Sequence, residues 1–130
     1  MNPDLVKLAV AGIVGAHGIG HVMGWLPALG IARIEGGSIR SWLLTDLIGD
    51  GVSRAVCGAI WLAPTIGFVV AAGGLFGDTT WWRPVAVASA IVSVVAIALF
   101  WEALPVFSRV GALAVNLAVV AAVANQWSPA

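Results

Sequence analysis

Charged side chains are scarce in this sequence. Of its 130 residues, six are basic and six are acidic, whereas 61% are apolar. Soluble domains are about 25% charged and about 45–50% apolar. Because so few charges cannot cover the surface of so apolar a soluble protein, the composition predicts an integral membrane protein embedded in the lipid bilayer. The zero net charge gives no reason to expect nucleic acid as a partner.

Cysteine is also scarce, since Cys57 is the single one. One thiol excludes an internal disulfide and a metal site built on cysteines, and we expect it to pack inertly. There is no sequence repeat and no linker long enough to divide domains. The apolar runs predict one all-α domain, a four-helix membrane bundle with spans at about 5–26, 55–76, 84–101 and 106–125.

The first span carries both histidines of the chain, His17 and His21. Four residues apart, they share one face of a helix. Small residues recur on two other sides of this span, so we expect it at the bundle centre with both imidazoles facing the interior. We interpret it as a retained span rather than a cleaved signal peptide, because Lys7 follows Asp4 and histidines interrupt the apolar run.

Polar side chains gather at one end of the predicted bundle. In a four-span topology the first and third connections share one membrane face. The charged residues near that face are Asp46, Asp50, Arg54, Glu102 and Arg109. Asn116 lies about two helical turns inside it. We therefore expect a polar pocket lined by His17, His21, Glu102 and Asn116, with the 46–54 segment near its mouth.

The long first connection, about 27–53, contains a further helical pattern. From Ser38 onward apolar residues recur at helical spacing, with Ser38 as the expected N-cap. This predicts a short helix at the membrane interface. Four arginines on this face, against one lysine and one arginine opposite, favour a pocket that opens toward the cytoplasm.

Proton transfer is the chemistry that this pattern favours. An ionisable group inside a membrane span is costly and marks a functional site by default, and imidazole can act as a general acid or base near neutral pH. We expect His17 or His21 to move a proton and Glu102 or Asp50 to be the complementary group. The alternatives are that the imidazoles bond across helices and that Glu102 pairs with Arg109.

Five further residues are candidates for substrate contacts. Asn116 would orient the substrate or else hold two helices together. Asp46, Asp50 and Arg54 would form either a polar wall of the pocket or a salt-bridged corner. Trp61 and Trp101 would line a hydrophobic cavity or serve packing and interface anchoring.

Neither a metal nor another cofactor is expected. The spacing of His17 and His21 matches two ligands on one face of a zinc helix, but the glutamate of that motif is missing. A third ligand would have to be Asp46, Asp50 or Glu102. Both axial ligands of one haem cannot come from a single such turn, and the nearby glycines lack the spacing and the strand of a nucleotide-binding loop.

The end of the first span has a distinctive pattern, namely His17-Gly18, His21, Gly24-Trp25 and Gly30. In a four-span protein of this size, the pattern resembles the DoxX-like family. Many members carry a lysine three residues after the glycine of the His-Gly pair, where this chain has His21. The resemblance implies a bacterial inner-membrane protein, and some members are linked to quinone or thiol redox chemistry.

The function that joins these observations is a small membrane enzyme acting on a lipophilic substrate by acid/base chemistry, such as isomerisation, cyclisation or ring opening. The layout of histidines and acids is chemically similar to that of sterol-isomerase-like membrane enzymes. One alternative is a DoxX-like accessory subunit, non-catalytic or serving quinone or thiol redox chemistry, with a quinone as cofactor. Another is a proton-coupled exporter that uses His17. The sequence leaves open whether the chain forms a homo-oligomer.

Overall fold

The computed structural model describes residues 2–127, and the regular structure of that range is entirely helical. The helices are α1 Pro3–Gly20, α2 Val22–Ala28, α3 Leu44–Ile48, α4 Asp50–Phe76, α5 Trp82–Leu99, the 3₁₀ helix η1 Trp101–Ala103 and α6 Val106–Ala124. Four segments are long and apolar enough to cross a membrane: α1 together with α2, α4, α5 and α6. Even the shortest, with 18 residues, extends about 27 Å against a hydrocarbon core of about 30 Å. The predicted all-α four-helix membrane bundle is confirmed.

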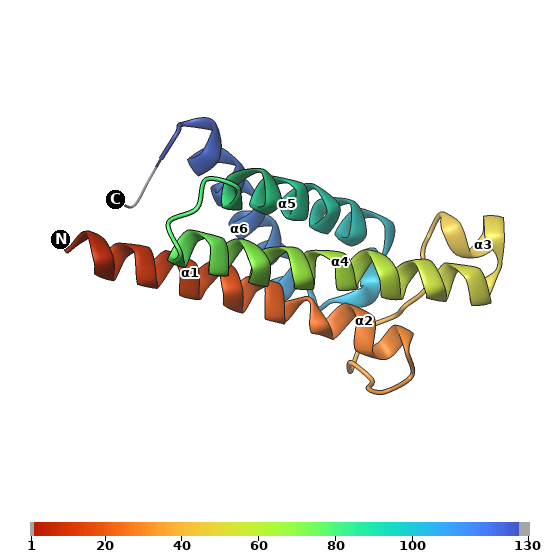
Figure 1. The fold of residues 1–130 in the computed structure, drawn as a ribbon. Helices are drawn as coiled ribbons and strands as arrows, with labels where there is room; N and C mark the ends of the chain where they lie inside the picture. The colour runs from red at the N-terminus through yellow and green to blue at the C-terminus, as the bar shows by residue number, and fades with distance from the viewer. Residues whose placement is uncertain (1, 128–130) are drawn as a thin grey trace.

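The connections alternate between the two ends of the bundle (Figure 1). The start of α1, the α4–α5 turn and the end of α6 lie at one end, and α3 lies at the other together with the turn before α6. At the first end an ion pair joins Lys7 to Asp78, with Nζ 2.8 Å from Oδ2. The first and third connections therefore share one end, as the sequence predicts.

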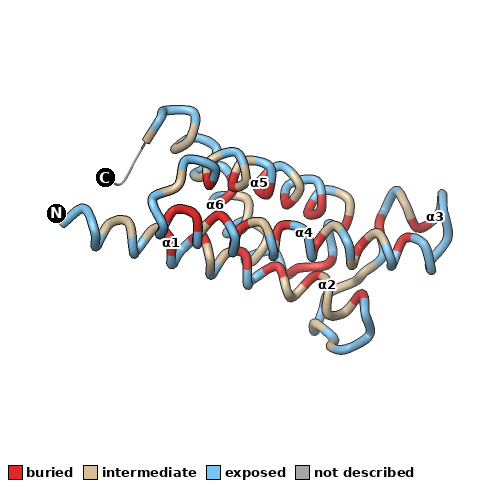
Figure 2. The backbone as a smooth tube through the Cα atoms, in the orientation of Figure 1, coloured by how far each residue is buried: buried red, intermediate tan, exposed pale blue. Residues whose placement is uncertain are grey.

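Helix α4, rather than the first span, occupies the centre. It packs against α1 and α2 on one side and α5 on the other, while α6 packs on α5. The expectation that the first span is central is wrong, because its small residues contact a neighbouring helix on one side only. A Cβ added to Gly18 would meet Phe68 of α4, whereas a Cβ added to Gly12 or Gly20 would have nothing within 4 Å. In Figure 2 the buried residues accordingly follow the faces that α1, α4 and α5 present to one another.

His21 interrupts the first span and separates α1 from α2. Its amide bonds the carbonyl of Gly18, and the amide of Gly24 bonds the carbonyl of His21, so the chain tightens to 3₁₀-type bonds here. The carbonyl of His17 instead accepts a bond from Nδ1 of the His21 ring at 2.8 Å. At the junction of α1 and α2, the backbone carbonyl of His17 is therefore bonded to the side chain of His21.

The long connection is bonded to the end of α5. Ser38 donates its amide to the carbonyl of Glu102 at 2.8 Å, and the indole of Trp42 donates to the carbonyl of Ala98 at 2.6 Å. The short helix α3 lies in this connection, but the expected cap is wrong: Leu43 occupies the N-cap position without a side-chain cap bond, and the hydroxyl of Ser41 accepts the amide of Leu44 at 3.0 Å. Helix formation there starts later because Ser38 is held by its bond to η1 and Trp42 by its bond to α5.

Helix α4 begins earlier than the predicted span. Gly49 has a φ of 84°, which glycine adopts without a steric penalty, so the chain turns there and the helix starts at Asp50. Arg40 bonds Asp50 at 3.0 Å and Asp46 at 3.3 Å. The acidic corner is thus salt-bridged by an arginine from the preceding loop.

Candidate functional site

Four polar side chains meet inside the bundle, although they come from three separate membrane segments. Nε2 of His17 lies 2.9 Å from Oδ1 of Asn116 on α6. Nδ2 of Asn116 lies 2.8 Å from Oγ of Ser93 on α5, and that Oγ lies 2.6 Å from Nε2 of His21. With the bond from His21 to the His17 carbonyl, the contacts form a closed ring, which we call the polar ring.

The direction of every bond in the polar ring follows from one fixed acceptor. A carbonyl oxygen accepts and cannot donate, so Nδ1 of His21 carries a hydrogen and, in a neutral imidazole, Nε2 is the acceptor. Ser93 must then donate its hydroxyl hydrogen to His21 and accept from the amide nitrogen of Asn116. The amide oxygen of Asn116 is left to accept from His17, whose Nε2 therefore carries a hydrogen.

Running the polar ring in the opposite direction needs one more proton. Were the Asn116 amide flipped, its oxygen would accept from Ser93, whose oxygen would then have to accept from Nε2 of His21. His21 would carry hydrogens on both nitrogens and a positive charge. With both imidazoles neutral the ring therefore has a single hydrogen-bonding pattern, in which His17 is protonated on Nε2 and unprotonated on Nδ1.

The polar ring lies between two apolar clusters that exclude water. His21, Ser93 and Asn116 are 2%, 0% and 1% exposed. On one side lies the cluster containing Phe68, whose ring centroid is 4.8 Å from that of His17. On the other lies the cluster containing Trp61, 5.6 Å from the His21 ring. Fully satisfied polar networks in such surroundings are strong and fix one arrangement of the helices.

His17 differs from the other members because it is half-buried. Its Nδ1 forms no hydrogen bond with any residue in the described range 2–127. This atom is not among the fully buried polar atoms that lack a partner in that range, so it is not completely enclosed. Under the bonding pattern above, Nδ1 holds an available lone pair. It is the basic atom of the site.

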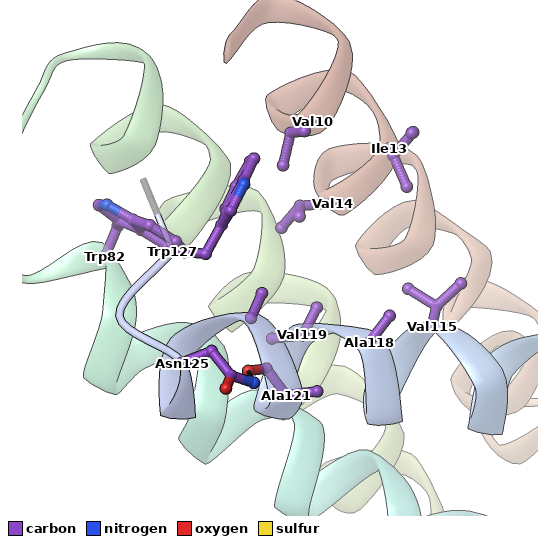
Figure 3. A pocket seen from close by; sticks show the side chains of 11 residues that line it. Val10, Ile13, Val14, Trp82, Val115, Ala118, Val119, Ala121, Asn125 and Trp127 are labelled. Atoms are coloured by element: carbon purple, nitrogen blue, oxygen red, sulfur yellow. Dashed lines mark hydrogen bonds between the residues drawn. The ribbon is translucent and has the colours of Figure 1, made fainter. Parts of the chain in front are cut away.

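An apolar cleft of about 490 Å³ lies between α1 and α6. Figure 3 shows its walls, with Val10, Ile13 and Val14 from α1 facing Val115 and Val119 from α6. Trp82, Asn125 and Trp127 surround the end that lies away from the polar ring. The cleft exists because α6 packs on α5 and not closely on α1.

The cleft lies next to the polar ring along the chain, although none of the four ring residues belongs to its lining. His17 follows Ile13 and Val14 by one helical turn, and Asn116 directly follows Val115. The hydrogen bond between His17 and Asn116 therefore joins the two walls next to the cleft. An occupant of the cleft would have its inner end near the imidazole of His17.

The carboxylates predicted to face the histidines lie elsewhere. Glu102 is exposed in η1 and lines a surface hollow with Arg40 and Asp46. Asp50 is exposed and paired with Arg40. The structure thus brings His17, His21 and Asn116 together in a closed ring of hydrogen bonds, and none of them lines the cleft or the surface hollows. Glu102, Asp46 and Asp50 lie outside the polar ring.

The remaining predicted residues serve other contacts. Trp61 packs against Gly24 and the His21 ring, and its buried indole nitrogen has no partner within residues 2–127. Trp101 lies 4.6 Å under the guanidinium of Arg109, which also donates to its carbonyl at 2.7 Å. Within the described range Arg109 forms no ion pair with Glu102. Arg54 is exposed beside three surface hollows.

Ser93 and Arg40 are the two residues that sequence reasoning missed as members of these sites. The spacing of Ser89 and Ser93 indicates that one face of the third span can bond a partner helix, and Ser93 does so. No comparable signal marks Arg40, which lies in an irregular segment. Among the described residues, no group of three histidine, cysteine or acidic side chains is arranged to hold a metal ion.

The fold and the polar ring define a four-span helical membrane protein with a hydrogen-bonded histidine pair held inside the bundle. No family model, no curated protein and no solved structure matches the chain. The resemblance to the DoxX-like family therefore remains a prediction from the residues of the first span.

Proposed function

We propose that this protein is a membrane enzyme in which His17 acts as general base toward a lipophilic substrate held between α1 and α6. The observation that carries the proposal is the state of the His17 ring. Asn116 holds Nε2–H, which leaves the lone pair of Nδ1 available, and Ile13 and Val14, one helical turn before His17, line an apolar cleft. A base must combine an available lone pair with a fixed orientation, and this imidazole has both.

The polar ring supports proton uptake at Nδ1. When Nδ1 gains a proton, His17 becomes an imidazolium whose Nε2–H still donates to Oδ1 of Asn116. Hydrogen bonds from charged donors are roughly twice as strong as neutral ones, so this contact stabilises the charged intermediate. Ser93 holds the amide of Asn116 from its other end, which keeps the oxygen aimed at His17.

One base suffices for the isomerisation predicted from the sequence. His17 takes a proton from a carbon between a carbonyl group and a double bond of the substrate, the electron pair is delocalised onto the carbonyl oxygen as a dienolate, and the same imidazolium returns the proton to the far carbon of the former double bond. The atoms and charge balance without any carboxylate. This route fits a site in which Glu102 and Asp50 lie outside the polar ring.

The cleft indicates the class of substrate. Its volume is about 490 Å³, within the range of about 300–1,000 Å³ that is usual for small-molecule sites. Aliphatic side chains form most of its walls. A neutral, largely hydrocarbon molecule that enters from the bilayer fits such a cleft. A quinone fits poorly at the inner end, because Nδ1 of neutral His17 cannot donate a bond to a quinone carbonyl.

The test is solvent exchange, which works whatever the identity of the substrate. The purified protein is incubated in D₂O with a total lipid extract, and deuterium incorporation into each lipophile is followed by mass spectrometry. We expect one lipophile to gain deuterium with the native protein and none with His17→Gln. Ser89→Ala serves as a matched control, because the Ser89 hydroxyl bonds the carbonyl of Val85 on its own helix and lies outside the polar ring. Equal exchange with the native protein and His17→Gln would refute the proposal.

A non-catalytic subunit is the second candidate, and α6 is the observation that favours it. Asn116 is the one buried residue of this helix, and large apolar side chains such as Phe107 and Leu117 are 91% and 71% exposed. A subunit would lose a co-purifying partner when the outer face of α6 is changed, as in Leu117→Ser, and would show no deuterium exchange.

A further inference from the structure

We propose that the junction of α2 and α4 is a binding site for one anionic phospholipid, whose phosphate is held by Arg54 and Arg33 and whose acyl chain lies in a groove between the two helices. This site lies apart from the polar ring and from the α1–α6 cleft. It does not depend on the proposed enzymatic function.

Two arginines supply the charge for a phosphate. Arg33 and Arg54 line one hollow of about 450 Å³ together with Ser38, and no carboxylate belongs to its lining. Within residues 2–127 neither arginine forms an ion pair. Asp50 lines a neighbouring hollow with Arg54 but is paired with Arg40. Guanidinium groups bind phosphate oxygens through paired N–H donors, so the hollow is complementary to a phosphate group.

The neighbouring groove is suited to a hydrocarbon chain. It has a volume of about 540 Å³, and Arg54 is the one charged residue in its lining. Its wall on α4 consists of residues at successive positions of one helical face, namely Gly51, Arg54, Ala55, Gly58, Ala59 and Leu62. Trp25, Ala28 and Leu29 form the wall on α2. The small side chains on α4 keep the floor of the groove open.

The groove is long enough for most of the depth of one leaflet. From Arg54 to Leu62 the helix rises about 12 Å, and half of a hydrocarbon core is about 15 Å. Arg54 lies near the end of the groove where α4 begins, and Arg33 lines the adjoining hollow. A lipid with its phosphate at Arg54 would therefore extend its chain along α4 to about the middle of the bilayer.

The charge balance predicts a preference among lipids. Phosphatidylcholine carries a phosphate but also a cationic choline, whereas phosphatidylglycerol is anionic. An arginine near a membrane surface favours anionic lipid by about fivefold. Two arginines that form no ion pair within residues 2–127, in a hollow whose lining contains no carboxylate, should therefore select phosphatidylglycerol over phosphatidylcholine by at least about fivefold.

The test measures lipid binding by native mass spectrometry on the full-length protein in detergent, titrated with phosphatidylglycerol or with phosphatidylcholine. The variants are Arg54→Gln and Arg33→Gln, with Arg83→Gln at the opposite end of the bundle as a matched control. Ala59→Leu narrows the groove without changing the charge. Circular dichroism and thermal unfolding establish that each variant is folded before it is compared.

We expect the native protein and Arg83→Gln to prefer phosphatidylglycerol by about fivefold or more, and Arg54→Gln to lose most of that preference. Ala59→Leu should weaken binding of both lipids. A preference that survives Arg54→Gln, or that falls equally with Arg83→Gln, would overturn the proposal. If inorganic phosphate displaces phosphatidylglycerol completely at millimolar concentration, or if Ala59→Leu has no effect, the site binds a free anion and the lipid assignment is wrong.

Discussion

Nε2 of His17 lies 2.9 Å from Oδ1 of Asn116, and within the described range this hydrogen bond is the one that joins α1 to α6. It is also one bond of a ring in which every donor has a defined acceptor. The same contact therefore holds a loosely packed helix in the bundle and fixes the protonation pattern of an imidazole beside an apolar cleft. The first two predictions follow from these two roles.

Replacing Asn116 should destabilise the bundle. Asn116→Ala leaves the Nε2–H of His17 and the Oγ of Ser93 without this partner in an apolar interior. An unsatisfied buried polar group costs about 1–3 kcal/mol, so we expect a loss of that size in the free energy of unfolding in lipid bicelles. Ser89→Ala should change it by less than about 0.5 kcal/mol. A loss below that limit for Asn116→Ala would show that the polar ring contributes little.

The two histidines should be opposite tautomers at neutral pH. The bonding pattern places the hydrogen on Nε2 in His17 and on Nδ1 in His21, because the latter faces a carbonyl oxygen. The ¹⁵N chemical shifts of the protein in bilayers, measured by solid-state NMR, distinguish the two ring nitrogens directly. Asn116→Leu should release the constraint on His17 and leave that on His21. Finding both rings in one tautomer would contradict the pattern.

Glycines of the first span should respond differently to the same substitution. A Cβ at Gly24 would overlap the buried indole of Trp61, whereas Gly20 has open space around it. Overpacking a buried contact costs about 1–3 kcal/mol, while alanine in an open helical position gains up to about 1 kcal/mol over glycine. We expect Gly24→Ala to lower and Gly20→Ala to maintain or raise the temperature of unfolding. Equal effects would show that α2 and α4 are not in close contact at Gly24.

Filling the α1–α6 cleft should reduce the binding of lipophilic molecules. Ala118 lines the cleft, and Ala118→Leu would occupy part of it without affecting the polar ring. Ala114→Leu is the matched control, because Ala114 lies on the same helix but outside the lining. The measurement is retention of lipophiles during purification, quantified by mass spectrometry. We expect a loss of at least about tenfold for Ala118→Leu, the effect of about 1.4 kcal/mol; similar retention in both variants would refute the cleft as a binding site.

The sequence predicted the depth of the polar groups in the membrane well. It predicted less well which of these groups contact one another. Depth follows from counting residues along regular helices of known rise, so the common end of Glu102, Asp50 and Arg54 was foreseeable. Contact across the bundle depends on which helices are neighbours and how each is rotated about its axis. Small residues on two sides of the first span predicted neighbours on both, yet α4 packs along one side and the other is open.

The sequence by itself determined the membrane class, the four spans and the shared helical face of His17 and His21, because composition and periodicity act locally along the chain. The tertiary structure decided that Ser93 and Asn116, rather than Glu102 or Asp50, are the partners of the imidazoles. The physical reason is that these partners lie more than seventy positions from the histidines. They meet because α4 packs between the first span and α5, and α6 packs on α5, which no local pattern specifies.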